Sequence, residues 1–219
     1  VRETYGAAPT VLRADRGSSI RRGRSGSAAT DGAGPTPLIL RLATRAPFAG
    51  EEIVGFLAAR AIPGVEAVAP DGTYHRVLSL PHGPAIVALS PAADHVSARL
   101  DLADLRDLGP AVERCRRVLD LDADPHAVDE VLGADPLLAP LVAATPGRRS
   151  PGAVDGTELL VRAIVGQQVS VAGARTVAAR LALALGEEIP SALAAAGPAG
   201  LTHAFPSAEA IVAVDQATL

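Results

Sequence analysis

Residues 157–187 read TELLVRAIVGQQVSVAGARTVAARLALALGE. Apolar residues recur at helical spacing before and after the pair Gln167-Gln168, which predicts two amphipathic helices joined at a corner. One face of the first helix carries Leu160, Ala163, Ile164 and Gln167, and the buried stripe expected for the second helix is Val171, Ala174, Ala178, Leu181 and Leu185. This stretch therefore indicates a helical domain in the second half of the chain.

Local signals mark the ends of the two helices. Asp155 precedes the first apolar turn and is expected to cap it, with Glu158 completing a capping-box-like pair. Gly186 follows the last periodic residue and is expected to end the second helix. The connection between the helices is consequently limited to a few residues around the glutamine pair.

The two adjacent glutamines have two alternative interpretations. Both amides could cap helix ends or face solvent, as polar residues at a helix junction commonly do. Alternatively, Gln167 and Gln168 form a polar finger at the corner, because an amide both donates and accepts hydrogen bonds and so suits base edges and the gaps beside phosphates. The spacing alone leaves both interpretations open.

Working toward the N-terminus, residues 38–102 predict a small α+β unit. A strand at 38–44 is followed by a helix at 51–61, in which Ile53, Phe56, Leu57 and Arg60 share one face. The later strands are expected at residues 65–69, 73–80, 84–90 and 95–102, separated by Pro- and Gly-containing turns. The predicted order is strand, helix and then an antiparallel meander.

From residue 105 the hydrophobic period is helical. Further helices are expected at 108–119, from Asp124-Pro125 onward, at 137–144 and weakly near 207–214, with a loop at 146–152. Cys115 lies in the first of these helices and is predicted to be a buried, inert thiol. Since it is the single cysteine, no internal disulfide can form.

Three separate segments resemble the AlkA-type 3-methyladenine DNA glycosylase II family of the helix-hairpin-helix glycosylase superfamily. They are residues 157–187, residues 51–80 with the run GFLAARA, and residues 118–132 (VLDLDADPHAVDEVL). The resemblance covers about residues 38–215 and implies a TBP-like α+β domain (β-α-β meander) followed by an incomplete all-α helix-hairpin-helix domain. It implies release of alkylated purines such as 3-methyladenine from double-stranded DNA by base flipping and hydrolysis, in base-excision repair. It implies no cofactor and no metal, and we expect a monomer.

Carried over position by position, the resemblance assigns candidate site residues. Phe56 matches an aromatic that lines the base pocket, and Gln167 lies beside it at the hairpin that enters the minor groove. Gln168 stands where well-known members of the family have an apolar wedge; an amide can fill that gap but recovers less apolar burial than leucine. The remaining candidates for DNA contact, Arg148, Arg149 and Arg162, are expected either to bind phosphates or to lie on the solvated surface.

The family's catalytic aspartate, which follows a Pro-Gly-x-Gly hairpin, is not recognisable in this sequence. Pro63-Gly64-Val65 imitates that hairpin for three residues, but Ala67 stands where its second glycine belongs, and Asp215 comes too early. We therefore assign no catalytic residue, expect the aspartate beyond Leu219, and interpret the chain as a truncated, inactive glycosylase.

The N-terminal residues 1–13 (VRETYGAAPTVLR) resemble the end of an AraC-type helix-turn-helix domain. We therefore divide the chain into that end at 1–16, a Gly/Ser/Arg-rich linker at 17–37, the α+β domain at 38–104 and the truncated helical domain at 105–219. The alternative function is an Ada-like DNA-binding regulator whose glycosylase-like part recognises damage. A weaker third possibility is an interaction scaffold without DNA affinity.

Charge and composition exclude several other classes. All 20 basic residues are arginine and the net charge is −4, which gives no global attraction to nucleic acid, although residues 1–30 carry six arginines against two acidic residues. No membrane span or signal peptide is evident, so we expect a cytoplasmic protein. The spacings of Asp120, Asp122 and Asp124, and of His75 and His82, do not match a metal site.

Overall fold

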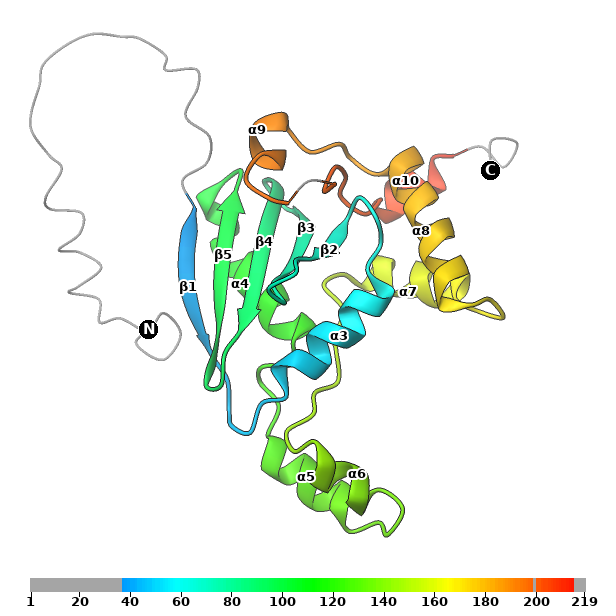
Figure 1. Cartoon of the computed structure of the whole chain (residues 1–219). Helices are drawn as coiled ribbons and strands as arrows, with labels where there is room; N and C mark the ends of the chain where they lie inside the picture. The colour runs from blue at the N-terminus through cyan, green and yellow to red at the C-terminus, as the bar shows by residue number, and fades with distance from the viewer. Residues whose placement is uncertain (1–36, 199, 215–219) are drawn as a thin grey trace, which may run out of the picture.

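The computed structural model describes residues 37–198 and 200–214. The predicted helix-turn-helix end at 1–16, most of the predicted linker, and Asp215 and Leu219 lie outside the described residues. Within them, five strands form one antiparallel sheet and the helices cluster around it (Figure 1). The predicted fold class, an α+β domain followed by a helical part, is confirmed.

The sheet has the strand order β1-β5-β4-β3-β2. Its strands are β1 (Leu38–Ala43), β2 (Glu66–Val68), β3 (Tyr74–Leu80), β4 (Gly83–Pro91) and β5 (His95–Leu102). Strands β2 to β5 follow one another as a meander, and helix α3 (Gly50–Arg60) carries the chain from β1 at one edge to β2 at the other. This is the predicted order of strand, helix and meander.

Helices α3 and α4 (Leu108–Val118) pack on one face of the sheet. In α3 the buried side chains are Ile53, Val54 and Leu57, a stripe of spacing i, i+1, i+4. Phe56 does not belong to this stripe although it shares a predicted face with Ile53 and Leu57: it is 42% exposed, because the buried stripe includes Val54 and is rotated away from it. Phe56 therefore lies at the solvent-facing side of α3.

Cys115 in α4 is buried as predicted. Burial raises the pKa of its thiol to about 12, since a thiolate there would lose its hydration. The thiol consequently stays protonated and unreactive at neutral pH.

A segment that the sequence pattern did not reveal covers part of the other face of the sheet. Val77 and Ile86 pack there against a cluster from the C-terminal region formed by Ile189, Leu193, Leu201 and Ala204. This region includes the short helix α9 (Ser191–Ala194), which contacts β4. The chain thus returns from the helices to the sheet before α10 (Ala208–Val212), whose N-cap is Ser207.

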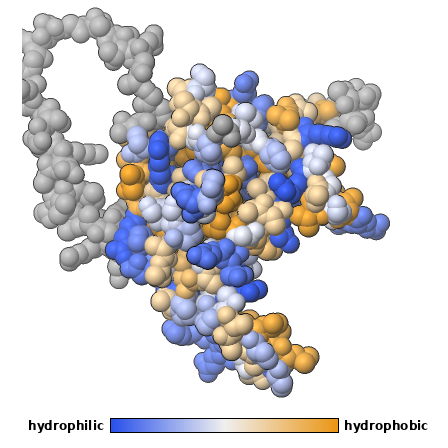
Figure 2. Space-filling model, in the orientation of Figure 1, coloured by the Kyte–Doolittle hydropathy of each residue, from blue (hydrophilic) through white to orange (hydrophobic). Residues whose placement is uncertain are grey.

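Helices α5 (Pro125–Gly133) and α6 (Ala139–Ala144) form a hairpin that projects from the body of the protein, after the short 3-10 helix η1 (Leu105–Asp107) and α4 (Figure 1). Asp124 caps α5 as predicted. The exposed apolar side chains of this hairpin, seen as an apolar area in Figure 2, include Val131, Leu132, Leu137 and Leu141.

The helices on either side of the glutamine pair are α7 (Gly156–Val165) and α8 (Val171–Leu185). The apolar face that Leu160 and Ile164 share in α7 is open to solvent. Leu160 and Ile164 are 61% and 58% exposed, and the buried residue of α7 is the charged Glu158. The reason is that α7 contacts the α+β domain through its polar side, with Glu158 and Arg162. The apolar periodicity of the sequence identifies the apolar face of the helix, but it does not show whether another element packs on that face.

The predicted face of α8 is partly correct. Ala178 is buried and Leu181 packs against the same cluster, but Val171 is exposed, and the stripe is completed by Ala179 and Ala182 instead.

Within residues 37–198 and 200–214, none of the helices combines the length and apolar character that crossing a membrane requires.

Candidate nucleic-acid interface

The glutamine pair lies in a tight corner between α7 and α8. At the end of α7, the backbone N–H of Gly166 donates to the carbonyl oxygen of Arg162 at 2.9 Å. The next N–H, that of Gln167, donates to the Ile164 carbonyl oxygen at 3.1 Å. Ser170 then caps α8, its hydroxyl oxygen accepting from Gly173 N–H at 3.1 Å. The predicted corner is confirmed. Gln167 lies in the connection after α7, not within that helix, and it is exposed.

Gln168 has a backbone φ of +59°, in the left-handed region that residues other than glycine seldom adopt. This residue lies in the middle of the five-residue connection 166–170, so the backbone strain of the corner is at Gln168. In the part of the chain that the structure describes, neither glutamine side chain makes a hydrogen bond, and both caps are supplied by other groups. Capping by the amides is therefore excluded, whereas the solvent-facing position and the polar finger both stay open, because the two side chains are exposed and free to contact a ligand.

The predicted candidates form two separate groups. Phe56, Arg148 and Arg149 border a cavity of about 570 Å³ between α3, the loop after α6 and the α5–α6 hairpin. Arg162 and the glutamines belong to the α7–α8 corner, where a smaller cavity of about 270 Å³ lies against the end of α3. Phe56 and Gln167 do not line one common cavity within the described residues.

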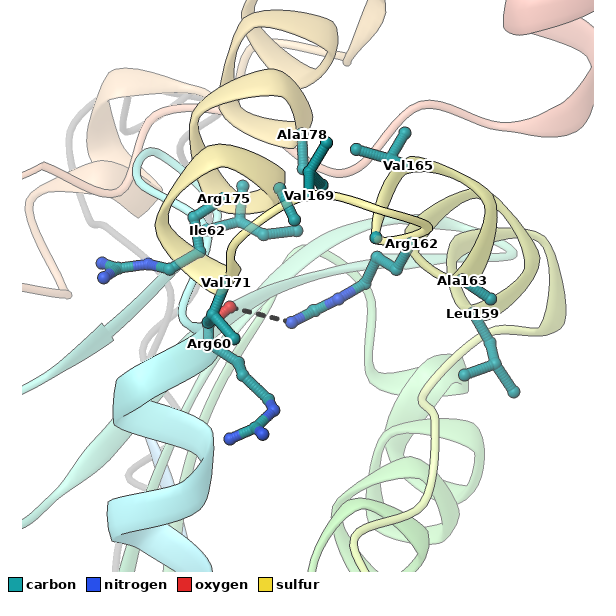
Figure 3. A pocket seen from close by; sticks show the side chains of 12 residues that line it. Arg60, Ile62, Leu159, Arg162, Ala163, Val165, Val169, Val171, Arg175 and Ala178 are labelled. Carbon is teal, nitrogen blue, oxygen red and sulfur yellow. Dashed lines mark hydrogen bonds between the residues drawn. The ribbon is translucent and has the colours of Figure 1, made fainter.

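The corner cavity is mainly apolar with arginines at its margin (Figure 3). Its apolar residues come from the segment after α3, from α7, from the corner and from α8: Ile62, Leu159, Ala163, Val165, Val169, Val171, Ala174 and Ala178. Arg60, Arg162 and Arg175 contribute the charges. A pocket of this composition accommodates flat or apolar groups and favours negative charge near its entrance.

The three arginines predicted to contact DNA differ in availability. Arg148 is exposed and holds Glu52 and Thr145 only at 3.3 and 3.4 Å, so its guanidinium can turn to a phosphate. Arg149 is 6% exposed and donates to the carbonyl oxygen of Arg45 at 2.6 Å, while burial lowers its pKa. The guanidinium of Arg149 is thus engaged in holding the loop after β1.

Arg162 is also engaged within the protein. One of its terminal nitrogens lies 3.0 Å from Oε2 of Glu66 and 3.0 Å from Oε1 of Glu158, and the other donates to the Arg60 carbonyl at 2.9 Å. Asp155 caps α7 as predicted, but the carboxylate of Glu158 pairs with Arg76 and Arg162 instead of accepting from the Asp155 N–H, so only half of the predicted capping box forms.

Sequence reasoning missed Glu66 and its buried partner Arg76. Arg76 lies 3.2 Å from Glu66 and 2.7 Å from Glu158 through its two terminal nitrogens, and Tyr74 donates its hydroxyl to Glu66 at 2.6 Å. Burial by itself would raise the pKa of Glu66, but Arg76 and Arg162 hold that pKa below its usual range. The available signal was the presence of charged residues at inward-facing strand positions, where apolar residues are the rule.

No group of three or more histidine, cysteine, aspartate or glutamate side chains in residues 37–198 and 200–214 is arranged to hold a metal ion. His75 lies on β3, and Nδ1 of His82 is hydrogen-bonded to the carboxylate of the buried Asp107 at 2.7 Å. The carboxylates of Asp122 and Asp124 pair with Arg116 and Arg45. These side chains therefore serve local structure.

Solved structures that share this fold are DNA glycosylases. A 3-methyladenine DNA glycosylase from Archaeoglobus fulgidus aligns with a TM-score of 0.65 and 21% identity over 78% of this chain and 57% of that one. MBOgg1 in complex with a low-affinity DNA ligand aligns with a TM-score of 0.59 and 22% identity over 85% of this chain and 57% of that one. The arrangement of sheet and helices is accordingly the fold of this class of protein.

The AlkA N-terminal domain model matches residues 39–155, and the chain belongs to that family. A relative in two strains of Mycobacterium tuberculosis, described as a probable bifunctional transcriptional activator/DNA repair enzyme AlkA, is 48% identical over 215 residues, which are 98% of this chain and 40% of the relative. DNA-3-methyladenine glycosylase 2 of Escherichia coli K12 is 37% identical over 71% of this chain and 57% of its own length. The chain thus spans about half the length of these relatives, or less.

Proposed function

We propose that this chain is part of a cytoplasmic DNA N-glycosylase of base-excision repair, which flips alkylated purines such as 3-methyladenine out of double-stranded DNA and hydrolyses their bond to the sugar. Family membership and the description of the Escherichia coli relative support the class of reaction. The observation that carries the proposal is the α7–α8 corner, where the side chains of Gln167 and Gln168 are exposed and make no hydrogen bond within the described residues, and where Gln168 has a left-handed backbone.

The corner suits entry into the minor groove of DNA. Its width is set by a short connection, and Gln168 at its apex can fill the space that a flipped nucleotide leaves while its amide hydrogen-bonds the unpaired base opposite. We assign Gln167 to a base contact at the corner and Phe56 to base stacking in the separate cavity that it borders with Arg148, since the two residues do not line one cavity within the described residues. Arg148 contributes a phosphate contact. Arg149 and Arg162 are left out of the proposed contacts, because their guanidinium groups are held inside the protein.

The test compares this chain on three duplexes of one sequence: undamaged, methylated, and carrying a tetrahydrofuran analogue of an abasic site. We expect tighter binding to the abasic analogue than to the undamaged duplex, and we expect Gln168→Ala to reduce that preference. Gln167→Ala serves as the neighbouring control within the same corner. Equal affinity for all three duplexes, together with no release of 3-methyladenine from the methylated one, would overturn the proposal for this chain.

A second candidate is a DNA-binding regulator in which this part of the chain recognises damage. It is favoured by the Mycobacterium tuberculosis relative, whose description includes transcriptional activation and whose match covers 98% of this chain. Methylated DNA separates the two candidates, since a glycosylase releases free 3-methyladenine whereas a regulator only retards the DNA in a gel. Release of the base above a DNA-only control would also contradict the expectation that the chain is inactive.

A further inference from the structure

Glu66 lies at the start of β2 with a side chain that is only 2% exposed. Its carboxylate accepts four hydrogen bonds: from Ile62 N–H at 2.9 Å, from the Tyr74 hydroxyl at 2.6 Å, and from Arg76 and Arg162 at 3.2 and 3.0 Å. Three of these donors belong to the α+β domain, and the fourth belongs to α7. Glu66 is therefore a joint between the sheet domain and the helix that leads into the corner.

Arg162 transmits this contact to the corner. It lies in the last turn of α7, where its carbonyl oxygen accepts the N–H of Gly166, the residue that begins the corner. Its guanidinium spans Glu66, Glu158 and the Arg60 carbonyl at the end of α3, the last of which is drawn in Figure 3. A planar guanidinium with several directed donors fixes the orientation of its helix more tightly than a single ammonium contact does.

The helix after the corner has a matching tie. Arg175 in α8 donates from Nε to the carbonyl oxygen of Ala61 at 2.7 Å. The carbonyl oxygens of Arg60 and Ala61 are consecutive, and both stand at the C-terminal end of α3, where backbone acceptors lack partners within the helix. One arginine from each side of the corner thus satisfies one of these two carbonyl groups.

Apolar packing alone does not account for the position of α7. Leu159, Leu160 and Ile164 are all more than half exposed, whereas Glu158 is buried. The buried network contains two carboxylates, Glu66 and Glu158, and two guanidinium groups, Arg76 and Arg162, so its formal charges balance. A balanced buried network of this kind adds little net stability over an apolar contact, but it specifies geometry because each partner must stand in one place.

We propose that Glu66 is a positioning residue for the corner: through Arg162 it sets where Gln167 and Gln168 stand relative to the α+β domain. The consequence for DNA rests on the proposed function, in which the corner enters the minor groove. The consequence for the protein is that the corner loosens when the contact between Glu66 and Arg162 is broken, and this does not depend on the proposed function.

The test uses the 219-residue chain with Glu66→Gln, which keeps the size of the side chain but removes its charge. The matched control is Asp101→Asn, because Asp101 is an equally buried carboxylate that pairs with Arg99 within β5. Two quantities are measured for each: hydrogen exchange across residues 157–187, and the ratio of dissociation constants for undamaged duplex and duplex with the abasic analogue. Both variants are also unfolded in urea, so that a general loss of stability is known.

Glu66→Gln is expected to speed exchange at the amides of Gly166 and Gln167 and to lower the ratio by about tenfold, whereas Asp101→Asn leaves both unchanged. In a Gln168→Ala background, Glu66→Gln is expected to have no further effect on the ratio, because it acts through the corner. If Glu66→Gln does not fold, Arg162→Gln breaks the same joint while leaving Glu66 paired with Tyr74 and Arg76.

Three outcomes decide the matter. Loss of stability in Glu66→Gln with unchanged exchange at the corner overturns the positioning role. Changes of equal size in Asp101→Asn overturn it as well. If the unaltered chain does not distinguish the two duplexes, the proposed function fails, and the exchange measurement alone still decides whether Glu66 holds the corner.

Discussion

The guanidinium of Arg60 lies over the ring of Phe56, with its central carbon 3.6 Å from the ring centroid. The two residues are one helical turn apart on α3, so the stacking is local and attractive. It covers one face of a ring that is otherwise partly open to solvent. Phe56, which the family resemblance assigns to the base pocket, therefore has the positive charge of Arg60 against one face of its ring.

Because Phe56 is not in the core, its removal should be inexpensive. We expect Phe56→Ala to lower the free energy of unfolding by about 1 kcal/mol at most, from lost stacking. The neighbouring Leu57→Ala should cost about 2–5 kcal/mol, since Leu57 is buried against the sheet. Urea denaturation of both variants measures the difference, and similar costs for the two would show that Phe56 is a core residue after all.

The left-handed backbone of Gln168 predicts an unusual response to glycine. Gln168→Gly should raise the free energy of unfolding by about 1 kcal/mol, because glycine has no Cβ to strain at a φ of +59°. Gln167→Gly, one residue earlier and outside the left-handed region, should give no such gain. The difference in the free energy of unfolding is measured from the midpoints of denaturant unfolding curves whose slopes are equal. The same Gln168→Gly variant should lose preference for abasic DNA, so that stability and recognition move in opposite directions.

The pKa of Glu66 predicts part of the acid sensitivity of the chain. Burial would raise this pKa, but Arg76 and Arg162 hold it below the usual 4.5, so the folded chain keeps the carboxylate ionised where the unfolded chain protonates it. The resulting stability is fully present above the unfolded pKa and is lost as pH falls from there through the folded pKa. Between about pH 5 and pH 3, Glu66→Gln should therefore lose less stability than the unaltered chain. Parallel acid-dependence curves for the two proteins would contradict this.

Cys115 should be silent toward thiol reagents in the folded chain. Its pKa of about 12 and its burial leave almost no thiolate at about pH 8. Iodoacetamide should add no mass to the native protein and one equivalent after unfolding in urea, because the chain has a single cysteine. Labelling of the native protein at the unfolded rate would show that α4 opens readily from the sheet.

Much of the fold follows from local pattern. Asp124 and Asp155 cap the helices that they precede, and the glutamine pair marks the corner between α7 and α8. These features depend on residues within a few positions of one another, so their signals are contiguous in the sequence. The inward face of α3 was the weaker prediction, since Val54 rather than Phe56 completes its buried stripe.

The candidate site was predictable only in part. The exposed pair Gln167 and Gln168 could be located from the sequence, and so could Arg162 beside it, whereas Arg60 and Arg175, which also border the corner cavity, were not among the candidates. The sequence did not show that Arg162 is engaged with Glu66, because these residues are 96 positions apart and nothing local specifies the pairing. It also did not show that Phe56 borders a different cavity from the one beside the corner.

The sequence by itself thus determined most of the strands and helices, and that two amides stand at a corner, but not α9 or the return of the chain to the sheet. Short-range periodicity, capping and turn residues carry that information, because they act within one or two turns of chain. Only the tertiary structure decided that α7 meets the sheet domain through Glu158 and Arg162 and leaves Leu160 and Ile164 exposed. An amphipathic pattern defines two faces of a helix, whereas the partner of each face depends on contacts between residues far apart in the chain.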